Sequence, residues 1–149
     1  MATFLLTRAT RLTPEACWDR LTDWPRHGDR VPFTEVSAAV GSGRAVGDVV
    51  LARTALGPVV FDDPMEITVF AAPSAGRDGR CRLEKRGRIV RGWAELRVGR
   101  RDGGGAEAAW VEEIRVSGLP AALDPVTARV ARLVFGRALD GLLSPEPGR

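Results

Sequence analysis

The hydrophobic pattern of this chain has a helical period near both ends and a strand-like period through the middle. Seven runs are β-branched or alternate between apolar and polar residues, and Gly, Pro or Asp separates most of them. They are residues 3–11, 34–40, 48–56, 59–71, 81–90, 92–101 and 106–116. Because six of these runs follow one another from residue 34 onward, the pattern predicts an antiparallel meander of hairpins.

Two short helices are predicted after the first strand. Thr13 suits an N-cap and Pro14 the first helical position, so a helix should follow within residues 12–23. The next segment can form only one more short helical turn, because Pro25, Gly28 and Pro32 limit its length.

A long helix is predicted near the C-terminus. Asp124 is an N-cap candidate and Pro125 suits the first helical position. One apolar face follows at helical spacing: Val126, Val130, Leu133, Val134, Ala138 and Leu142, widened by Ala131, Phe135 and Leu139. The opposite stripe comprises Arg129, Arg132, Gly136 and Asp140. Such a helix of about 20 residues would be ~30 Å long, which is enough to cross a small sheet.

This order of elements predicts an α+β domain. We expect a curved antiparallel sheet of about seven strands, wrapped on the long C-terminal helix, with two short helices after strand 1. The sheet has one apolar face that needs a cover, and the long helix is the element large enough to supply it. If the sheet is strongly curved, a pocket opens between sheet and helix. Residues 1–144 are expected to form this single domain, with 145–149 as a flexible tail.

Composition and charge narrow the possible partners. The net charge is +3, but the arginines are spread along the chain and aromatic residues make up only 6%, so a nucleic-acid surface is not indicated. No segment approaches the ~20 apolar residues of a membrane span, and the N-terminal residues lack a signal-peptide pattern. We therefore expect a cytoplasmic protein whose two cysteines, Cys17 and Cys81, stay reduced and fill the core.

A corner with the pattern W..LTDW..H…VP follows the predicted first strand, at residues 18–32. This corner and the order of elements resemble the SRPBCC superfamily, which includes START-like domains, pollen-allergen-like proteins and the polyketide cyclase/dehydrase family. The matching stretches are residues 17–32, 57–67, 81–96 and 108–114. They look most like small bacterial members. The resemblance implies the helix-grip fold and an interior cavity for an apolar or aromatic ligand, which some members use for polyketide cyclisation.

Strand alternation places three ionisable side chains on positions that should face the cavity. Lys85, the only lysine, shares its face with Cys81, Leu83 and Ile89. Glu112 shares its face with Trp110 among others, and Arg53 with Val49 and Leu51. Because buried charges must be paired or solvated, we predict an interaction between Lys85 and Glu112, directly or through water. The alternative is a position at the cavity mouth or a bulge, since a slip of one residue would turn each charge outward.

The candidate ligand-binding residues combine these charges with apolar neighbours. They are Lys85, Glu112, Trp110, Arg53, Leu83, Trp24, Val130 and Val134. Catalytic candidates are Lys85, Glu112 and Arg53. No metal site is expected, because the chain has one histidine and its cysteines lack finger-like spacing. No cofactor is expected either.

The single histidine, His27, has two interpretations. It could act as a general base oriented by Asp23. The pattern favours a structural corner instead, since no nucleophile motif accompanies it. In that corner Asp23 caps the second helix, Trp24 packs against the sheet, and His27 lies on a polar rim beside Arg26.

Asp62 and Asp63 form an adjacent carboxylate pair. Neighbouring residues on a strand point to opposite faces, so the two cannot readily share one substrate. Pro64 indicates a bulge or bend at this point. One of the two carboxylates can still point inward.

Three functions remain open on the residues alone. The first is binding of a small hydrophobic or polycyclic molecule between sheet and C-terminal helix. The second is a polyketide aromatase/cyclase, in which the cavity holds a reactive chain in one conformation; the absence of Tyr removes one common proton donor from this alternative. The third is a protein-interaction module whose exterior Arg82, Arg86 and Arg88 meet an acidic partner.

Overall fold

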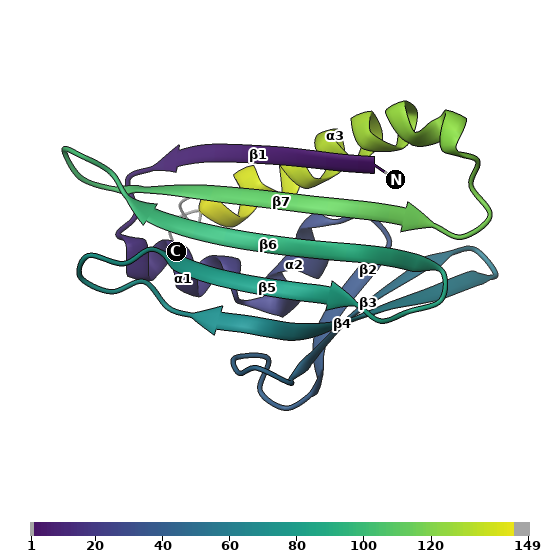
Figure 1. Ribbon diagram of the computed structural model, residues 1–149, viewed down its shortest axis with the longest axis horizontal. Coiled ribbons are helices and arrows are strands. Elements are labelled where there is room, and N and C mark those ends of the chain that lie inside the picture. Colours follow the sequence, from purple (N-terminus) through teal and green to yellow (C-terminus); the bar gives the residue numbers. More distant parts are fainter. Residues whose placement is uncertain (1, 145–149) are drawn as a thin grey trace.

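The computed structural model describes residues 2–144, and within them seven strands form one antiparallel sheet (Figure 1). The strand order is β1-β7-β6-β5-β4-β3-β2. The strands are β1 (Ala2–Thr10), β2 (Thr34–Val40), β3 (Val49–Leu56), β4 (Val59–Ala71), β5 (Gly79–Lys85), β6 (Val90–Arg100) and β7 (Ala106–Val116). The predicted meander is confirmed, and in addition β1 pairs with β7 at the other edge of the sheet.

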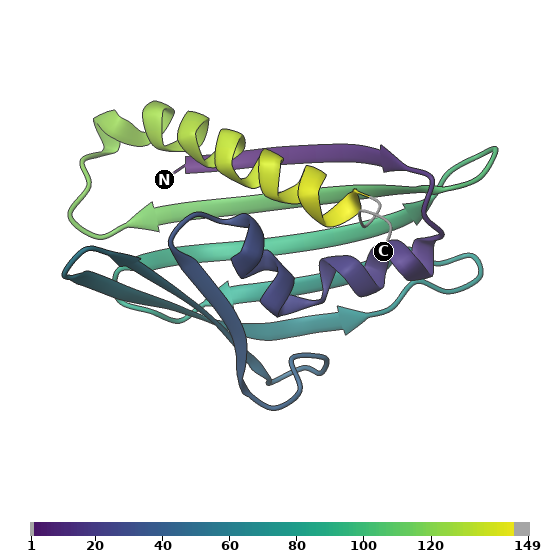
Figure 2. The same ribbon diagram turned by 180° about the vertical axis from the view of Figure 1, so that it is seen from behind.

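The helices lie on one face of the sheet (Figure 2). They are α1 (Pro14–Leu21), α2 (Trp24–Arg30) and α3 (Asp124–Leu143), with a 3-10 turn η1 (Ala121–Leu123) leading into α3. Register shifts between Ala38 and Val40 and between Ile67 and Val69 interrupt the ladders, and such bulges bend a sheet. This is the expected α+β helix-grip architecture, a curved sheet gripping a long C-terminal helix with two short helices after β1.

Element boundaries follow the local signals with two differences. Thr13 caps α1 as predicted, since its Oγ1 accepts a hydrogen bond from the Ala16 amide at 3.1 Å. Strand β5 ends at Lys85, however, because residues 86–89 form the turn into β6, and Ile89 is consequently exposed instead of inward-facing. Helix α3 has Leu123 at the N-cap in place of Asp124, because η1 runs directly into it. The predicted tail, 145–149, lies outside the described residues.

The face that α3 presents to the sheet differs from the predicted one. Val126, Val130 and Leu133 are each more than half exposed. The C-terminal part of the predicted outer stripe contacts β1 instead, whereas Arg129 and Arg132 are exposed as predicted. Arg8 packs against Gly136 and pairs with Asp140, its Nε lying 2.6 Å from the carboxylate oxygen Oδ1. The first turns of α3 extend beyond the edge strand β1, so their apolar side chains have no sheet beneath them (Figures 1 and 2).

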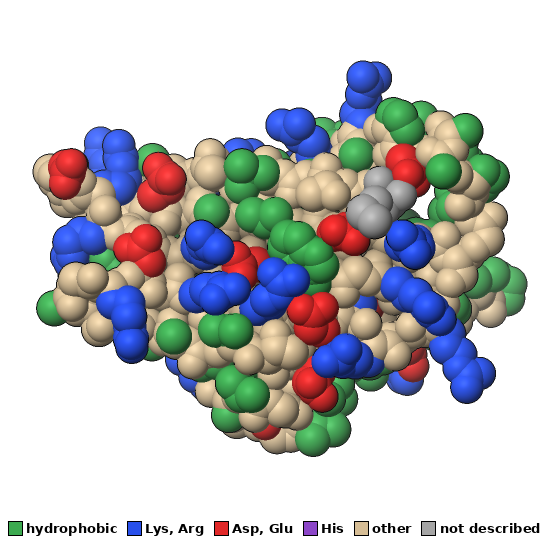
Figure 3. Space-filling model, in the orientation of Figure 1, with side chains coloured by type: hydrophobic (Ala, Val, Ile, Leu, Met, Phe, Trp, Pro, Cys, Tyr) green, Lys and Arg blue, Asp and Glu red, His purple; other side chains and the backbone are tan. Residues whose placement is uncertain are grey.

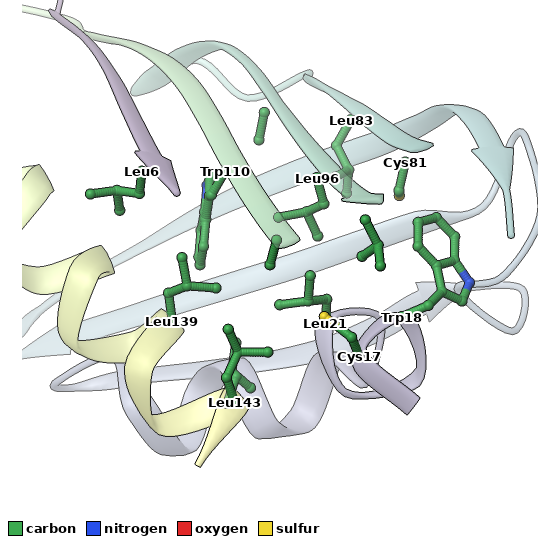
Figure 4. Close-up of a cluster of buried hydrophobic side chains, with 14 of the residues drawn as sticks. Leu6, Cys17, Trp18, Leu21, Cys81, Leu83, Leu96, Trp110, Leu139 and Leu143 are labelled. Carbon is green, nitrogen blue, oxygen red and sulfur yellow. The ribbon is translucent and has the colours of Figure 1, made fainter. Parts of the chain in front are cut away.

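The solid part of the core lies under α1 and the C-terminal half of α3 (Figure 4). Trp18 and Leu21 of α1 and Leu139 of α3 are almost fully buried against the sheet. Cys17 and Cys81 are unpaired and fill this core, as expected. Burial raises the pKa of Cys17 to about 11 and that of Cys81 to about 12, so both thiols stay protonated and unreactive.

Of the helices in residues 2–144, none is both long and apolar enough to cross a membrane.

The observed orientation of α3 predicts unequal effects of two leucine truncations on the same helix. Leu139→Ala should lower the free energy of unfolding by about 2–5 kcal/mol, because it opens a hole in the solid core. Leu133→Ala, which truncates a side chain 56% exposed, should change it by no more than about 0.5 kcal/mol. Urea denaturation measures both. Similar losses from the two variants would contradict the observed orientation.

Candidate functional site

A cavity of about 230 Å³ lies between the inner face of the sheet, α2 and α3. Most of its wall is apolar, with Val36, Val50, Leu83, Leu96 and Ile114 from the strands and Phe135 from α3. It occupies the end of the interior that the solid core leaves open. The sheet continues over this region, whereas α3 lies beside β1. The cavity is therefore covered by α2 and, from α3, by the ring of Phe135.

One end of the cavity reaches the surface. The lining residues nearest the β3–β4 turn and the β5–β6 turn, among them Thr54, Phe61 and Val90, are only half-buried, whereas Val50 and Leu96 are fully buried. Exposed apolar side chains border this open end, with Phe33 71% exposed and Leu56 49% exposed. The Phe33 carbonyl accepts a hydrogen bond from the Ala55 amide, which fixes the start of β2 beside the end of β3. The open end of the cavity is therefore bordered by apolar side chains.

A buried cluster of three charged side chains, Asp63, Lys85 and Glu112, interrupts the apolar wall. The Lys85 ammonium lies 2.6 Å from Asp63 Oδ2 on β4 and 2.9 Å from Glu112 Oε1 on β7. Strand β6 runs between β5 and β7 and presents Ala94, which pairs with both Leu83 and Glu112. Its methyl group leaves space for Lys85 to reach across. The predicted Lys85–Glu112 interaction is confirmed as a direct ion pair.

Further hydrogen bonds orient this cluster. Trp110 Nε1 donates to Glu112 Oε2 at 3.1 Å, and the third partner of Lys85 is the Met65 sulfur at 3.6 Å. Burial alone would lower the pKa of Lys85, but the Glu112 and Asp63 carboxylates outweigh it and raise that pKa above its usual value. Lys85 is therefore a cation. Burial raises the pKa of Asp63, with Lys85 opposing the shift.

His27 lies on the cavity wall beside Trp24 and not on the predicted polar rim. His27 is 7% exposed, and its Nε2 donates to the Leu21 carbonyl at 2.6 Å, which closes the α1–α2 corner. Trp24 Nε1 donates to the Gly43 carbonyl at 2.7 Å. Gly43 has a φ of +77°, and a Cβ there would lie 2.7 Å from the Trp24 ring, so this contact requires glycine. Asp23 stands at the N-cap of α2 without a side-chain capping bond and pairs instead with Arg26 at 3.3 Å.

Arg53 does not face the cavity, in contrast to the sequence prediction. It lies on the outer face, where its Nε is 2.7 Å from Asp62 Oδ1 on the neighbouring strand. The inward residues of β3 are Val50, Ala52 and Thr54. The error has a physical cause: residues 49–52 are apolar on both faces, so alternation alone could not assign the parity of β3.

Val130 and Val134 are likewise absent from the cavity wall, because α3 is rotated toward β1. Phe135, the next residue, points into the cavity in their place. The other candidates line it: Leu83, Lys85, Trp110, Glu112 and Trp24.

Asp63 is the site residue that sequence reasoning left undecided. The pairing of Arg53 with Asp62 across β3 and β4 contains the missing signal. If Asp62 forms an outward ion pair, then its neighbour Asp63 must point inward, because adjacent strand residues face opposite sides.

The buried His27 predicts how the stability of the protein depends on pH. Burial lowers the pKa of His27 below 6.5, although its bond to Leu21 and the Glu112 and Asp23 carboxylates oppose this. As pH falls below about 6.5, His27 binds fewer protons in the folded protein than in the unfolded chain, so its contribution to the free energy of unfolding should fall toward pH 5.

His27→Gln is the control for that measurement. Subtracting the variant curve from the wild-type curve isolates the contribution of His27 to the pH dependence of stability. The contribution of Asp63, whose raised pKa changes stability in the opposite direction, is present in both curves and cancels. Urea unfolding at several pH values between 5 and 7 supplies both curves. A difference that does not shrink as the pH is lowered would contradict a neutral, buried His27.

Removing the buried cation should destabilise the fold strongly. Lys85→Met leaves Asp63 and Glu112 buried together without a counter-ion, and we expect a loss of about 3–5 kcal/mol in the free energy of unfolding. Arg53→Met is the matched control, since it breaks an exposed ion pair and should leave stability nearly unchanged. Equal effects in urea denaturation would contradict the assignment of Lys85 to the interior and Arg53 to the surface.

The comparison with solved structures found proteins similar to this chain. No protein-family model matches it, and no curated protein matches it by sequence. The Zhui aromatase/cyclase from Streptomyces sp. R1128 is similar at a TM-score of 0.68 and 14% identity, over 95% of this chain and 90% of that one. TTHA0849 from Thermus thermophilus is similar at 0.73 and 11%, over 94% and 93%.

Ara h 8.0201 is a third similar structure, with a TM-score of 0.63 and 14% identity over 96% of this chain and 98% of that one. The TM-scores establish the shared architecture, whereas identities this low carry no conclusion about activity. The chain has the helix-grip fold that its resemblance to the SRPBCC superfamily implied.

Proposed function

We propose that this protein binds a small, mostly apolar molecule in the cavity, with a polar group of that molecule directed at Asp63, Lys85 and Glu112. The observation that carries the proposal is the cavity itself: an apolar space of about 230 Å³ with one open end and a single buried cluster of charged groups among its described lining residues. Ligand pockets commonly combine an apolar wall with a few placed polar groups. A structural core would have filled this space, since interiors pack closely.

The size of the cavity limits the ligand. A cavity of roughly 150 Å³ can hold benzene, whereas pockets for drug-sized ligands are about 300–1,000 Å³. The present volume lies between these, so a ligand of one or two fused rings fits without rearrangement. A larger polycyclic molecule would need α2 or the β3–β4 turn to move outward.

An aromatase/cyclase-type enzyme is the second candidate. Asp63, whose pKa is raised by burial, lies beside the Lys85 cation in the same cavity, and such a pair can exchange a proton with a bound carbonyl compound. Arg53 is removed from the candidate catalytic groups, because it lies outside. The cavity volume favours a short or cyclised substrate over a long polyketide chain.

The interaction-module alternative loses part of its basis. The outer face of the sheet carries interspersed cations and carboxylates (Figure 3). Arg82 pairs with Glu84 at 2.9 Å and stacks over the Trp93 ring, and Arg86 pairs with Glu66 at 3.2 Å. This positive face is therefore largely neutralised by its own carboxylates.

Naphthalene is a suitable probe for the proposed function, because it has two fused rings and no polar group. We expect saturable one-to-one binding to the wild-type protein in isothermal titration calorimetry. Ala52→Phe, which fills the cavity from β3, should abolish it. Ala55→Phe, on an exposed position of the same strand, should bind as the wild type does.

Equal binding by both variants would place the naphthalene elsewhere and overturn the proposal, as would no binding to the wild type. Native mass spectrometry of the purified protein gives an independent check. A co-purifying apolar molecule that is lost in Ala52→Phe and kept in Ala55→Phe would support the same cavity.

A further inference from the structure

One oxygen atom of the buried cluster has no hydrogen-bond partner. The three protons of Lys85 point to Asp63 Oδ2, Glu112 Oε1 and the Met65 sulfur. Glu112 Oε2 accepts from Trp110. The remaining oxygen of the cluster, Asp63 Oδ1, is buried and has no hydrogen-bond partner. Buried polar atoms in proteins are almost always paired, so this atom is incomplete without a donor.

Asp63 Oδ1 is also unusual within the molecule as a whole. In residues 2–144 only one other buried side-chain nitrogen or oxygen lacks a partner, Trp18 Nε1, and Trp18 belongs to the solid core. Asp63, by contrast, lies on the cavity wall. The unfilled acceptor and the unfilled space therefore occur together.

The charge of the cluster sets the sign of the ligand group. Two carboxylates face one ammonium, so the cluster has one negative charge in excess when Asp63 is ionised. The remaining titratable side chain on the described cavity wall is His27, which is neutral because its pKa is lowered. A carboxylate brought into this cavity would meet an unbalanced like charge in a poorly solvated place. A neutral group that donates a proton in a hydrogen bond would meet neither penalty.

We propose that the cavity selects small aromatic or alicyclic molecules that bear a hydroxyl or amino group and rejects carboxylates. The hydroxyl or amino group donates a hydrogen bond to Asp63 Oδ1. This inference rests on the proposed function. The apolar wall holds the rings. The polar group replaces the missing partner of Asp63. Lys85 keeps its present contacts and serves to hold the Asp63 carboxylate in position.

Naphthalene and three of its derivatives separate the possibilities by calorimetry at pH 7. The probes are naphthalene, 2-naphthol, 2-methoxynaphthalene and 2-naphthoate. We expect 2-naphthol to bind at least about tenfold more tightly than 2-methoxynaphthalene, which can accept but not donate, because an unfilled buried acceptor carries a penalty of this order. We expect 2-naphthoate to bind more weakly than naphthalene itself.

Variants at the two adjacent aspartates test the role of the atom. Asp63→Leu should bring the 2-naphthol to 2-methoxynaphthalene ratio close to one, and Asp62→Leu, on the outer face, should keep the wild-type ratio. Asp63→Asn preserves size and removes the charge, so 2-naphthoate binding should improve relative to naphthalene. If Asp63→Leu does not fold, the binding of 2-naphthoate to Asp63→Asn still tests the role of the Asp63 charge.

The outcomes distinguish the two proposals. If naphthalene fails to bind the wild type, the proposed function fails. If naphthalene binds but 2-methoxynaphthalene equals 2-naphthol, or 2-naphthoate binds best, the cavity binds ligands and the selection of donors is wrong. A wild-type preference for 2-naphthol that survives in Asp63→Leu would likewise overturn the assignment to Asp63.

Discussion

The cavity depends on how this protein keeps one ammonium group out of water. A buried lysine is costly unless opposite charges and hydrogen bonds replace its hydration, and here Asp63 and Glu112 supply both. These partners come from β4 and β7, on either side of the strands that carry Lys85 and Ala94, so the cluster ties four strands together at the cavity wall. Because the charges cannot move apart without being exposed, the wall holds its shape although no helix presses on it there.

The position of α3 divides the interior into a packed part and a part that contains the cavity. The helix rests on β1 at Gly136, which lies beside Arg8 and Leu6, and the Arg8–Asp140 ion pair holds it there. Its C-terminal half contributes Leu139 and Leu143 to the same solid core as Leu21 of α1 (Figure 4). Its first turns extend past the sheet edge, and only Phe135 reaches back over the cavity. A helix seated over β4 and β5 would have filled the same space with leucine and valine side chains.

The sequence was informative wherever one physical signal was unambiguous. Alternation along β5 and β7 correctly turned Lys85 and Glu112 inward, because each strand has one apolar face. Alternation failed for Arg53, since β3 is apolar on both faces near Leu51. The rotation of α3 could not be derived from its amphipathic pattern, because Gly136 carries no hydrophobic signal although it packs against Arg8 and Leu6 of β1. His27 was misplaced for a related reason: its bond to the Leu21 carbonyl exists only once both helices of the corner are in place.

The polar part of the cavity says more about a ligand than the architecture does. An apolar wall selects by size alone, and a missing methylene group in such a pocket changes affinity only modestly. A buried donor or acceptor that a ligand must satisfy discriminates far more strongly, since an unmatched ligand leaves it unpaired. Asp63 supplies that kind of constraint, because Lys85 already holds one of its oxygens and nothing in the described chain holds the other. The chemistry of the ligand should accordingly be sought at this one carboxylate, with the surrounding wall deciding how many rings can follow it.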